Sequence, residues 1–401
     1  MNHVLMYSDL KHRKECRDKM TDTIKLFYED AYIKEFDAEV LSCEKDKDGY
    51  KVVLDRTAFF PEGGGQYGDI GYLGKAKVFD TKEKTGIVYH KTDIALEAGT
   101  MVHGAIDWEV RFERMQQHSG EHIISGIVHR KFGYDNVGFH LGADYCTMDF
   151  NGPITKEELK EIEMEANRAI FANLSVNTLY PDKETLDEMT YRSKIEIDGQ
   201  VRIIEIPGID VCACCAPHVA STGEIGLIKL VDMTNYKGGE RINMLSGIRA
   251  LADYQIKQEN AKYIGNLLCE KENRIADAVG KMREEQIRLK QSVAELQKKL
   301  LVYKAGEIDI SEEIVSVFDE ALSGDAPREF MNLLLDRGAK ICAIFAGDDV
   351  GGYRYVIGSR TEDVRSINQQ LKEKFSARGG GKPEMVQGSL TGTESDIKAL
   401  F

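Results

Sequence analysis

Two short motifs in this chain carry nitrogen and sulfur donors at spacings that suit one metal ion. In the first, Gln117–His122, the two histidines are four residues apart, so on a helix both imidazoles project from one face. In the second, Cys214 and His218 flank three residues that include Pro217. Three imidazoles and one thiolate suit Zn²⁺, whereas Ca²⁺ and Mg²⁺ prefer oxygen ligands. We therefore predict one Zn²⁺ per chain, bound by His118, His122, Cys214 and His218.

Each motif also has a simpler interpretation. The histidine pair can be ordinary core or surface residues, and Cys212, Cys214 and Cys215 can form a thiol cluster without a metal. In the helix motif of metalloproteases a glutamate directly follows the first histidine. Here Glu121 comes three residues later and is expected to point elsewhere, so no protease is predicted. Two separate ligand pairs in one chain favour the zinc site.

Two glycine-rich segments are further candidate sites. The first contains Gly63, Gly64 and Gly65, which permit positive φ and close backbone approach. It lacks the Gly-Lys-Ser/Thr of a phosphate-binding loop, so ATP binding is not predicted, and a tight hairpin is its simplest interpretation. The second runs from Arg378 through three glycines to Lys382. We predict a loop there, whose free N–H groups between two cations suit an anion.

The hydrophobic pattern indicates the elements that hold these motifs. Short alternating segments such as Tyr50–Leu54 predict a β-rich, barrel-like unit over residues 23–105. Helical spacing over Val110–Phe132, ended by Gly133, places the histidine pair on a helix. Thr155-Lys-Glu-Glu158 matches a capping box, which predicts another helix.

The segments that follow mix strands and helices. Strands are expected at Ile195–Ile197 and Val201–Ile206, before the Cys-His loop, so residues 106–250 form a mixed domain. Apolar residues then recur every seven positions: Leu268, Ile275, Met282, Leu289, Leu296 and Tyr303, with Val279, Val293 and Leu300 four residues after three of them. This seam predicts a long helical segment over 251–311, as a coiled coil or a helical hairpin, with helix packing within the chain as the simpler alternative.

Composition limits the class of protein. The chain has 401 residues, of which 42% are hydrophobic and 30% charged, which is typical of a globular chain of two or three domains; with the segments above, we expect an α+β fold. Residues 312–401 form a small α/β domain, and residues 1–22 are expected to be a disordered extension. A net charge of −14 means that nucleic acid could bind only at a local basic patch. With no membrane-spanning stretch, no secretory signal and one clustered group among eight cysteines, we expect a cytoplasmic protein without disulfides.

Taken in order, these motifs resemble the editing domain of alanyl-tRNA synthetase and its free-standing relatives, the AlaX proteins. The resemblance is carried by LDRTAFFPEGGGQYGDIG at 54–71, QQHSGEHIISG at 116–126, CCAPHVASTGEIGLIKL at 214–230 and GGERI at 238–242. The tail ARGGGKPEMVQGS at 377–389 is similar to the DHH-associated C-terminal domain of that synthetase. The resemblance covers residues 23–401 and matches the long AlaX type, which keeps this C-terminal domain.

The resemblance implies a zinc-dependent hydrolase that removes serine, and secondarily glycine, from wrongly charged alanine tRNA, without aminoacylation activity. It implies the same four zinc ligands, and it makes Thr57 and Gln66 the pocket positions, with Thr57 reading the serine hydroxyl. RNA or substrate would contact Gly63, Gly64, Gly65, Arg378, Gly380, Gly381 and Lys382. The expected partners are alanine tRNA and a second copy of the chain, bound through the helical or C-terminal region.

One departure from the family pattern affects the metal loop. The commoner Cys-Gly-Gly-Thr-His is here Cys-Cys-Ala-Pro-His, which keeps both ligands but stiffens the backbone and leaves Cys215 as a competing ligand. Two other classes of function stay open. A zinc-stabilised tRNA-binding module without catalysis would keep the same metal site. A DHH-type phosphoesterase would need clusters of Asp and His for two metals, which the sequence lacks.

Overall fold

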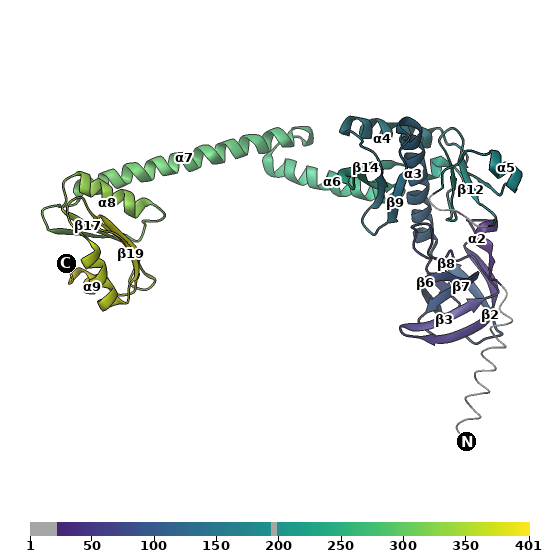
Figure 1. The fold of residues 1–401 in the computed structure, drawn as a ribbon, viewed down its shortest axis with the longest axis horizontal. Coiled ribbons are helices and arrows are strands. Elements are labelled where there is room, and N and C mark those ends of the chain that lie inside the picture. The colour runs from purple at the N-terminus through teal and green to yellow at the C-terminus, as the bar shows by residue number, and fades with distance from the viewer. Residues whose placement is uncertain (1–21, 194–198) are drawn as a thin grey trace, which may run out of the picture. The chain divides into compact units, whose positions relative to one another are not determined.

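The computed structural model describes residues 22–193 and 199–401, which form two compact units, one ending at Asn260 and one beginning at Ala261 (Figure 1). The prediction of a chain that mixes α-helices and β-strands is confirmed. The expected N-terminal extension, apart from Asp22, and the strand expected at Ile195–Ile197 lie outside the described residues. The finer division into five segments stays a prediction.

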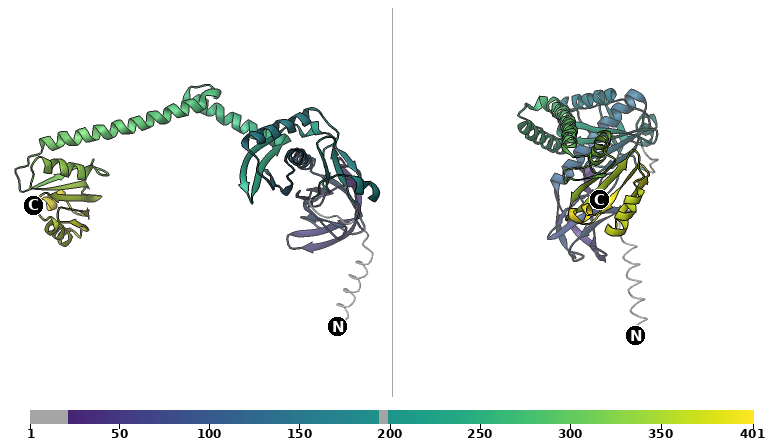
Figure 2. Two further views of the ribbon diagram at one scale, coloured as in Figure 1. Left: turned by 45° about the horizontal axis from the view of Figure 1, so that its top comes forward. Right: turned by 90° about the vertical axis from the view of Figure 1, so that its left-hand side faces the viewer.

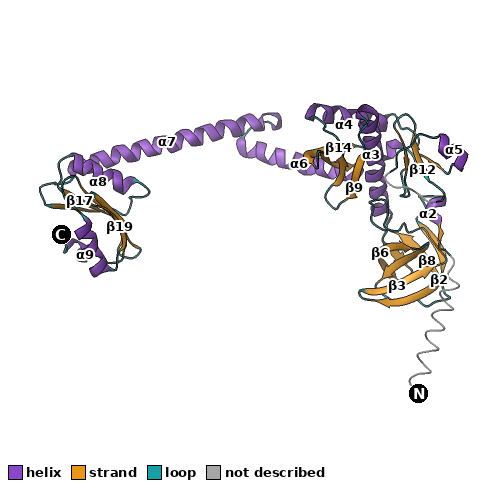
Figure 3. Ribbon diagram, viewed as in Figure 1, coloured by secondary structure: helices purple, strands orange, loops and turns teal. Residues whose placement is uncertain are grey.

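The first unit begins with a closed β-barrel, whose strands are grouped together in Figure 3. Its order is β2 (Glu35–Asp46), β3 (Gly49–Leu54), β7 (Ile87–Thr92), β6 (Ala76–Lys84), β5 (Gly71–Leu73) and β8 (Met101–Ile106). Alternate residues of β2 are buried, as a half-buried strand requires. Beside the barrel, β1 (Ile24–Lys25) pairs with β4 (Arg56–Thr57), and the short helix α2 (Leu26–Glu29) follows β1.

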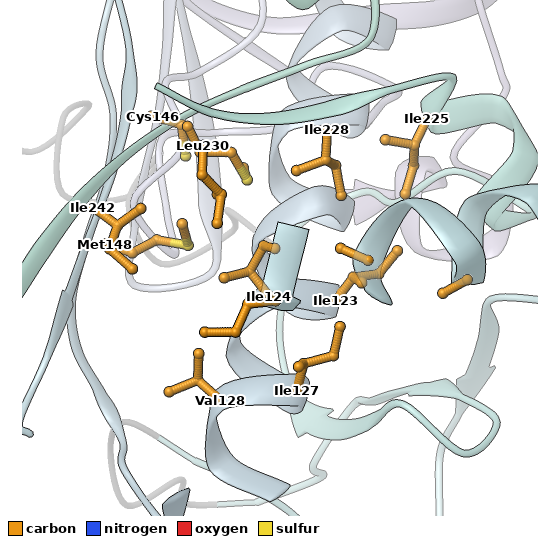
Figure 4. Packing of buried hydrophobic residues seen from close by; sticks show 14 of the residues in the cluster. Ile123, Ile124, Ile127, Val128, Cys146, Met148, Ile225, Ile228, Leu230 and Ile242 are labelled. Atoms are coloured by element: carbon orange, nitrogen blue, oxygen red, sulfur yellow. The ribbon is translucent and has the colours of Figure 1, made fainter. Parts of the chain in front are cut away.

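Helix α3 (Trp108–Phe132) leads from the barrel into the rest of the unit. The Asp107 side chain caps its start by accepting from the Val110 N–H, and Gly133, at a φ of 71°, ends it. Residues 115–128 are buried without a break, so this part of the helix is enclosed on all sides. Figure 4 shows Ile123, Ile124, Ile127 and Val128 packed among apolar side chains of β10, β14 and β15.

Two sheets and a helix enclose α3, which the left view of Figure 2 shows nearly end-on. One sheet has the order β14 (Ile228–Tyr236), β15 (Gly239–Ser246), β10 (Cys146–Phe150) and β9 (Asn136–Leu141). The other is β11 (Asn177–Leu179), β12 (Ile203–Ile206) and β13 (Asp210–Ala213). Helix α4 (Lys156–Phe171) begins with the predicted capping box of Thr155 and Glu158, and α5 (Lys183–Glu188) is a single short helix.

The segment predicted over 251–311 is helical but interrupted, so the prediction of one unbroken long helix is wrong. Helix α6 (Gly247–Leu268) ends in a motif in which Cys269, at a φ of 52°, donates to Asn266 and Glu270 donates to Gly265. Such paired bonds close a helix end in the left-handed conformation. After the 3₁₀ turn η2 (Glu272–Arg274), helix α7 (Ile275–Glu307) carries most of the heptad seam. The coiled coil itself stays a prediction.

The second unit ends in a sheet with the order β16 (Ile314–Phe318), β17 (Ile341–Asp348), β18 (Gly352–Ser359), β20 (Met385–Leu390) and β19 (Arg378–Lys382). Helices α8 (Ala326–Asp336), α9 (Arg365–Phe375) and α10 (Glu394–Lys398) complete it. The predicted Gly-rich loop is wrong, because these residues form the edge strand β19. A Cβ at Gly379 would collide with the Tyr355 hydroxyl and the Gln387 carbonyl, so glycine lets the strand pass there.

Candidate metal centre

The side chains of the two sequence motifs meet at one buried point between α3 and the loop after β13. One ligand atom from each of His118, His122, Cys214 and His218 lies within 4.8 Å of the others. The Cys214 Sγ atom is 3.6 Å from Nε2 of His118 and 3.4 Å from Nε2 of His218. In a tetrahedral zinc site, with bonds of about 2.3 Å to sulfur and about 2.1 Å to nitrogen, these ligand atoms are about 3.6 Å apart. The donor set therefore fits a tetrahedral metal ion.

The outer nitrogens of the two α3 histidines are each held by an acceptor. Nδ1 of His118 is 3.1 Å from the Gln66 Oε1 atom, and Nδ1 of His122 is 2.9 Å from Oδ2 of Asp210. Arg192 fixes Asp210 in turn, through Nε at 2.8 Å and Nη2 at 2.9 Å. Because both partners of the histidines only accept, each Nδ1 carries the proton and each Nε2 keeps its lone pair for a metal.

The loop that carries the other two ligands is anchored by polar contacts of its own. Ser119 Oγ lies 3.0 Å from Nδ1 of His218 and accepts from the Val219 N–H at 3.3 Å. Arg202 Nη1 donates to the carbonyl of Cys214 at 2.8 Å and to that of Ala216 at 2.9 Å. The sulfur and the imidazole are therefore placed by the fold, as a preformed metal site requires.

The electrostatics of the cluster favour a deprotonated Cys214 and a neutral His218, but a protonated His122. Burial raises the pKa of the Cys214 thiol, but the adjacent His118 and His218 outweigh it and hold that pKa well below its ordinary value. Burial lowers the pKa of His218 to about 3, although Cys214 opposes the shift. For His122, burial is outweighed by the hydrogen bonds to Asp210 and Cys214, which raise its pKa. A metal ion would replace the proton on His122 and balance the thiolate.

A pocket of about 640 Å³ opens beside the cluster. Its wall includes metal-site residues, aromatic rings and polar groups: Tyr28, Gly64, His118, Glu121, His122, Tyr180, Ser193, Gln200, Arg202, Cys212, Ala213, Cys214 and Cys215. A volume of this size is typical of sites for small molecules.

Glu121 lies in this wall, which corrects the expectation that it points elsewhere. Residues three and four apart share a helix face, so Glu121 lies on the same face as His118. It is 2% exposed, and its Oε1 atom accepts from Ser125 at 2.7 Å and from Asn136 at 2.5 Å. Its other oxygen is 3.8 Å from Nε2 of His122. A buried carboxylate thus stands beside the candidate metal.

The first glycine-rich segment reaches the same site. A Cβ at Gly64 would lie 3.4 Å from Cys215 Sγ and 3.8 Å from Cε1 of His118, at a φ of +60°. A Cβ at Gly65 would lie 2.5 Å from the Phe139 ring. Glycine at position 65 thus lets the backbone pass close to Phe139, and glycine at position 64 allows a positive φ next to His118. Gly63 and Gly65 line a neighbouring pocket of about 420 Å³ with Gln66.

The two predicted pocket residues have different surroundings. Gln66 is 1% exposed beside His118, and its Nε2 atom has no partner among the described residues. Thr57 is fully buried in the barrel, where its hydroxyl lies 2.8 Å from Nε2 of His90 and accepts from the Phe59 N–H. Neither Gln66 nor Thr57 is among the residues that line the 640 Å³ pocket; Gln66 lines the neighbouring 420 Å³ pocket. Its role as reader of a serine hydroxyl stays a prediction.

The remaining predicted residues belong to the second compact unit. Arg378, Gly380, Gly381 and Lys382 lie on β19, and a pocket of about 400 Å³ next to this strand includes Arg378 in its lining.

Three residues around the metal centre of the first unit were not predicted from the sequence: Asp210, Arg192 and Ser119. Ser119 was visible inside the histidine motif, whereas the spacing between Asp210 and His122 carries no recognisable pattern.

Parts of the chain match known families of tRNA synthetase domains. Residues 201–244 match the family described as the threonyl and alanyl tRNA synthetase second additional domain. Residues 3–110 match the family of class II (A) tRNA synthetases. The first match covers β12, β13, β14 and most of β15, and it includes Cys214 and His218.

Comparison with individual proteins extends the similarity to nearly the whole chain. The chain is 28% identical to the alanyl-tRNA editing protein AlaX-L of Pyrococcus horikoshii, over 93% of this chain and 96% of that protein. It is 29% identical to the alanyl-tRNA editing protein Aarsd1 of Rattus norvegicus, over 93% and 96%. The alanine–tRNA ligase of Pyrococcus furiosus is 32% identical, but the chain covers only 43% of that enzyme. The chain is thus similar along its length to free-standing alanyl-tRNA editing proteins, as the motifs predicted.

None of the helices in the described part of the chain combines the length and the hydropathy that a membrane span requires.

Proposed function

We propose that the protein hydrolyses the ester between a wrong amino acid and the 3′ end of alanine tRNA, with serine as the main substrate and glycine as the second. Water adds to the ester carbonyl, and the bond to the ribose oxygen breaks. The products are a free amino acid and tRNA with its terminal hydroxyl restored. The observation that supports this most is the convergence of His118, His122, Cys214 and His218 beside a pocket that holds a carboxylate.

Zinc is the metal that we propose for these four ligands, one ion per chain. When bound, it would supply a Lewis-acidic positive charge beside the ester. The residues of the chain have separate tasks. Glu121 can accept the proton of the attacking water, because its carboxylate lies in the pocket wall. Gln66 offers a buried amide donor for the substrate, because its Nε2 atom has no partner among the described residues.

We propose that the body of the tRNA contacts the sheet of the second unit. Arg354 on β18 and Arg378 on β19 both pair in register with Ser389 of β20, so the three side chains form a row on one face. Among the described residues, no ion pair is found for Arg354 or Arg378. Lys382 lies on the same face of β19 as Arg378, because residues four apart on a strand share a face. This row is a local basic patch of the kind that an acidic protein needs to bind RNA.

We also propose that the heptad seam of α7 pairs two copies of the chain. Along α7 the apolar seam residues are exposed, with Leu289 at 55% and Leu296 at 63%. An apolar stripe of this length that stays exposed in one chain is typical of an interface.

The test of the proposed activity is the release of amino acid from alanine tRNA charged with serine, glycine or alanine. The zinc-loaded protein should release serine fastest, glycine more slowly and alanine least. Glu121→Gln keeps the size of the side chain and removes the base, so it should slow serine release by roughly 10²–10⁴-fold. A zinc-loaded protein that binds the tRNA but accelerates none of the three reactions would instead favour the non-catalytic binding module.

A further inference from the structure

Beyond the metal ligands, the 640 Å³ pocket has a wall with two aromatic rings. Tyr28 and Tyr180 line the same pocket as His118 and Cys214. The ring of Phe27 packs edge-on against Tyr28, with the centroids 4.6 Å apart. The Tyr180 hydroxyl donates to the backbone carbonyl of Tyr28 at 3.3 Å, while the Tyr180 side chain stays 43% exposed. The two rings are therefore supported and accessible.

Arg202 adds a directional donor to this wall. Its guanidinium carbon lies 5.7 Å from the centroid of the Tyr28 ring. Its Nη1 is used by the carbonyls of Cys214 and Ala216, whereas its Nε is buried and has no partner among the described residues. A buried N–H donor without a partner is costly unless a ligand or water satisfies it. The wall thus offers two π-faces and one N–H donor.

These features match a purine, which has a flat π-face and ring nitrogens that accept hydrogen bonds. Stacking on aromatic side chains is the usual way in which proteins hold an unpaired base. An amino acid side chain alone would leave most of a 640 Å³ pocket empty, whereas an amino acid joined to a nucleoside would reach both the metal ligands and the tyrosines.

We propose that Tyr28, Tyr180 and Arg202 bind the adenine of the 3′-terminal nucleoside. The base stacks on a tyrosine ring, and one of its ring nitrogens accepts from the Arg202 Nε. This inference rests on the proposed function, because it requires the ester of the same nucleoside to lie beside His118 and Cys214. It assigns part of the substrate affinity to the terminal base, independently of the amino acid and of the tRNA body.

Two stable probes separate base recognition from the rest of the site. The first is 3′-(L-seryl)amino-3′-deoxyadenosine, in which an amide replaces the ester. The second is the same molecule with hydrogen in place of adenine. The wild-type protein, loaded with zinc, should bind the first probe about 5- to 160-fold more tightly, because stacking of one base on an aromatic side chain is worth about 1–3 kcal/mol.

Variants of the two tyrosines then assign this difference to the wall. Tyr28→Leu and Tyr180→Leu should each lower the affinity for the adenine probe by roughly five- to thirtyfold. The affinity for the base-free probe should change by no more than about twofold. Tyr180→Phe keeps the ring and should retain binding of the adenine probe. Tyr72→Leu is the matched control, because Tyr72 is 52% exposed on β5 and is not among the residues that line this pocket.

The outcomes separate this inference from the proposed function. Base recognition by this wall is wrong if the wild type releases serine from tRNA but binds both probes with equal affinity. It is also wrong if the leucine variants lower the affinity for both probes equally. If the wild type releases no amino acid, the proposed function fails whatever the probes show. A preference of at least about fivefold for the adenine probe that disappears in Tyr28→Leu or Tyr180→Leu, with metal content unchanged, supports the assignment.

Discussion

One buried histidine in the barrel should make the fold sensitive to mild acid. His90 is fully buried, and it contacts the Thr57 hydroxyl at 2.8 Å and the Val52 carbonyl at 3.2 Å. Burial lowers its pKa to about 4, although the Val52 carbonyl opposes the shift. The unfolded chain binds this proton at a pKa of about 6.5. The stabilising effect of the neutral ring is therefore complete above pH 6.5 and is lost as the pH falls towards 4.

Between pH 7 and pH 5, protonation of His90 should lower the free energy of unfolding by about 2 kcal/mol. His90→Gln keeps a polar side chain of similar reach and cannot titrate in this range, so it should lack this loss. Unfolding by urea at several pH values measures both proteins. Any pH dependence that arises elsewhere in the chain contributes equally to the two curves. Equal pH dependence in both proteins would mean that His90 is not the sensitive group.

At the level of residues, the sequence predicts the candidate metal ligands better than it predicts the residues that hydrogen-bond to them. The His118/His122 and Cys214/His218 pairs have local spacing that matches a metal site, and the structure brings them together. Asp210 supports His122 across 88 positions, a distance in sequence at which no local pattern exists. Such pairs arise only when β13 is placed against α3, so they need the tertiary fold.

Among the elements, a buried ion pair ties the first glycine-rich segment to α3. Arg111 is fully buried; its Nε donates to Asp69 Oδ2 at 2.8 Å, and its Nη2 donates to the Ala58 carbonyl at 2.6 Å. Asp69 also accepts from the Phe60 N–H at 2.7 Å. Removing one partner leaves a buried charge uncompensated. The pair therefore fixes the position, relative to α3, of the residues on either side of Gly63, Gly64 and Gly65.

Asp69→Asn should destabilise the first unit by about 3–5 kcal/mol, because the Arg111 charge loses its counter-ion. Asp80→Asn is the control: its ion pair with Lys91, at 3.5 Å, lies near the surface and should be worth about 1 kcal/mol or less. Chemical unfolding of both variants gives the comparison. Similar small losses for the two substitutions would contradict an anchoring role for the buried pair.

The seam of α7 gives a second prediction for an element. If two copies pair through it, Leu289→Glu or Leu296→Glu places a charge in the interface and should convert the assembly to single chains. Gln291→Glu adds the same charge between two seam positions on α7 and should leave assembly intact. Sedimentation velocity over a range of concentrations measures the species. Unchanged sedimentation in both leucine variants would exclude pairing through this seam.

The elements that were predicted incorrectly share a physical cause. The glycines of β19 are typical of a loop by composition, yet they form a strand; neighbouring backbone at Gly379 and Gly381, and the Tyr355 hydroxyl at Gly379, leave no room there for a Cβ. The break after α6 occurs at Cys269, a residue that does not usually adopt a positive φ. The close contacts at β19 and the backbone conformation at Cys269 are both details of the folded chain that composition and periodicity do not contain.

For the whole molecule, an excess of negative charge makes a few cations decisive for tRNA binding. The net charge is −14, so nonspecific attraction to RNA is weak. Replacing Arg354 and Arg378 with glutamine should weaken binding of uncharged alanine tRNA. The slope of log Kd against the logarithm of salt concentration should also decrease by about 1–2, because fewer counter-ions are released.

The matched control for this prediction removes the same charge elsewhere in the second unit. Lys372 and Lys374 are exposed on α9, and their replacement with glutamine should leave the salt dependence nearly unchanged. Lys382→Gln tests the residue predicted from sequence, and it should flatten the slope by less than the double arginine variant. Equal effects of the arginine and lysine pairs would mean that only net charge matters.

The most direct test of the account measures zinc and serine release together. The wild type should hold about one Zn²⁺ per chain, lose serine release when a chelator removes the metal, and regain both with added Zn²⁺. Cys214→Ala should hold little zinc and release little serine, whereas Cys215→Ala, a control in the same pocket wall, should keep both. Full serine release by a metal-free wild type, or equal zinc content in the two cysteine variants, would contradict the assigned centre.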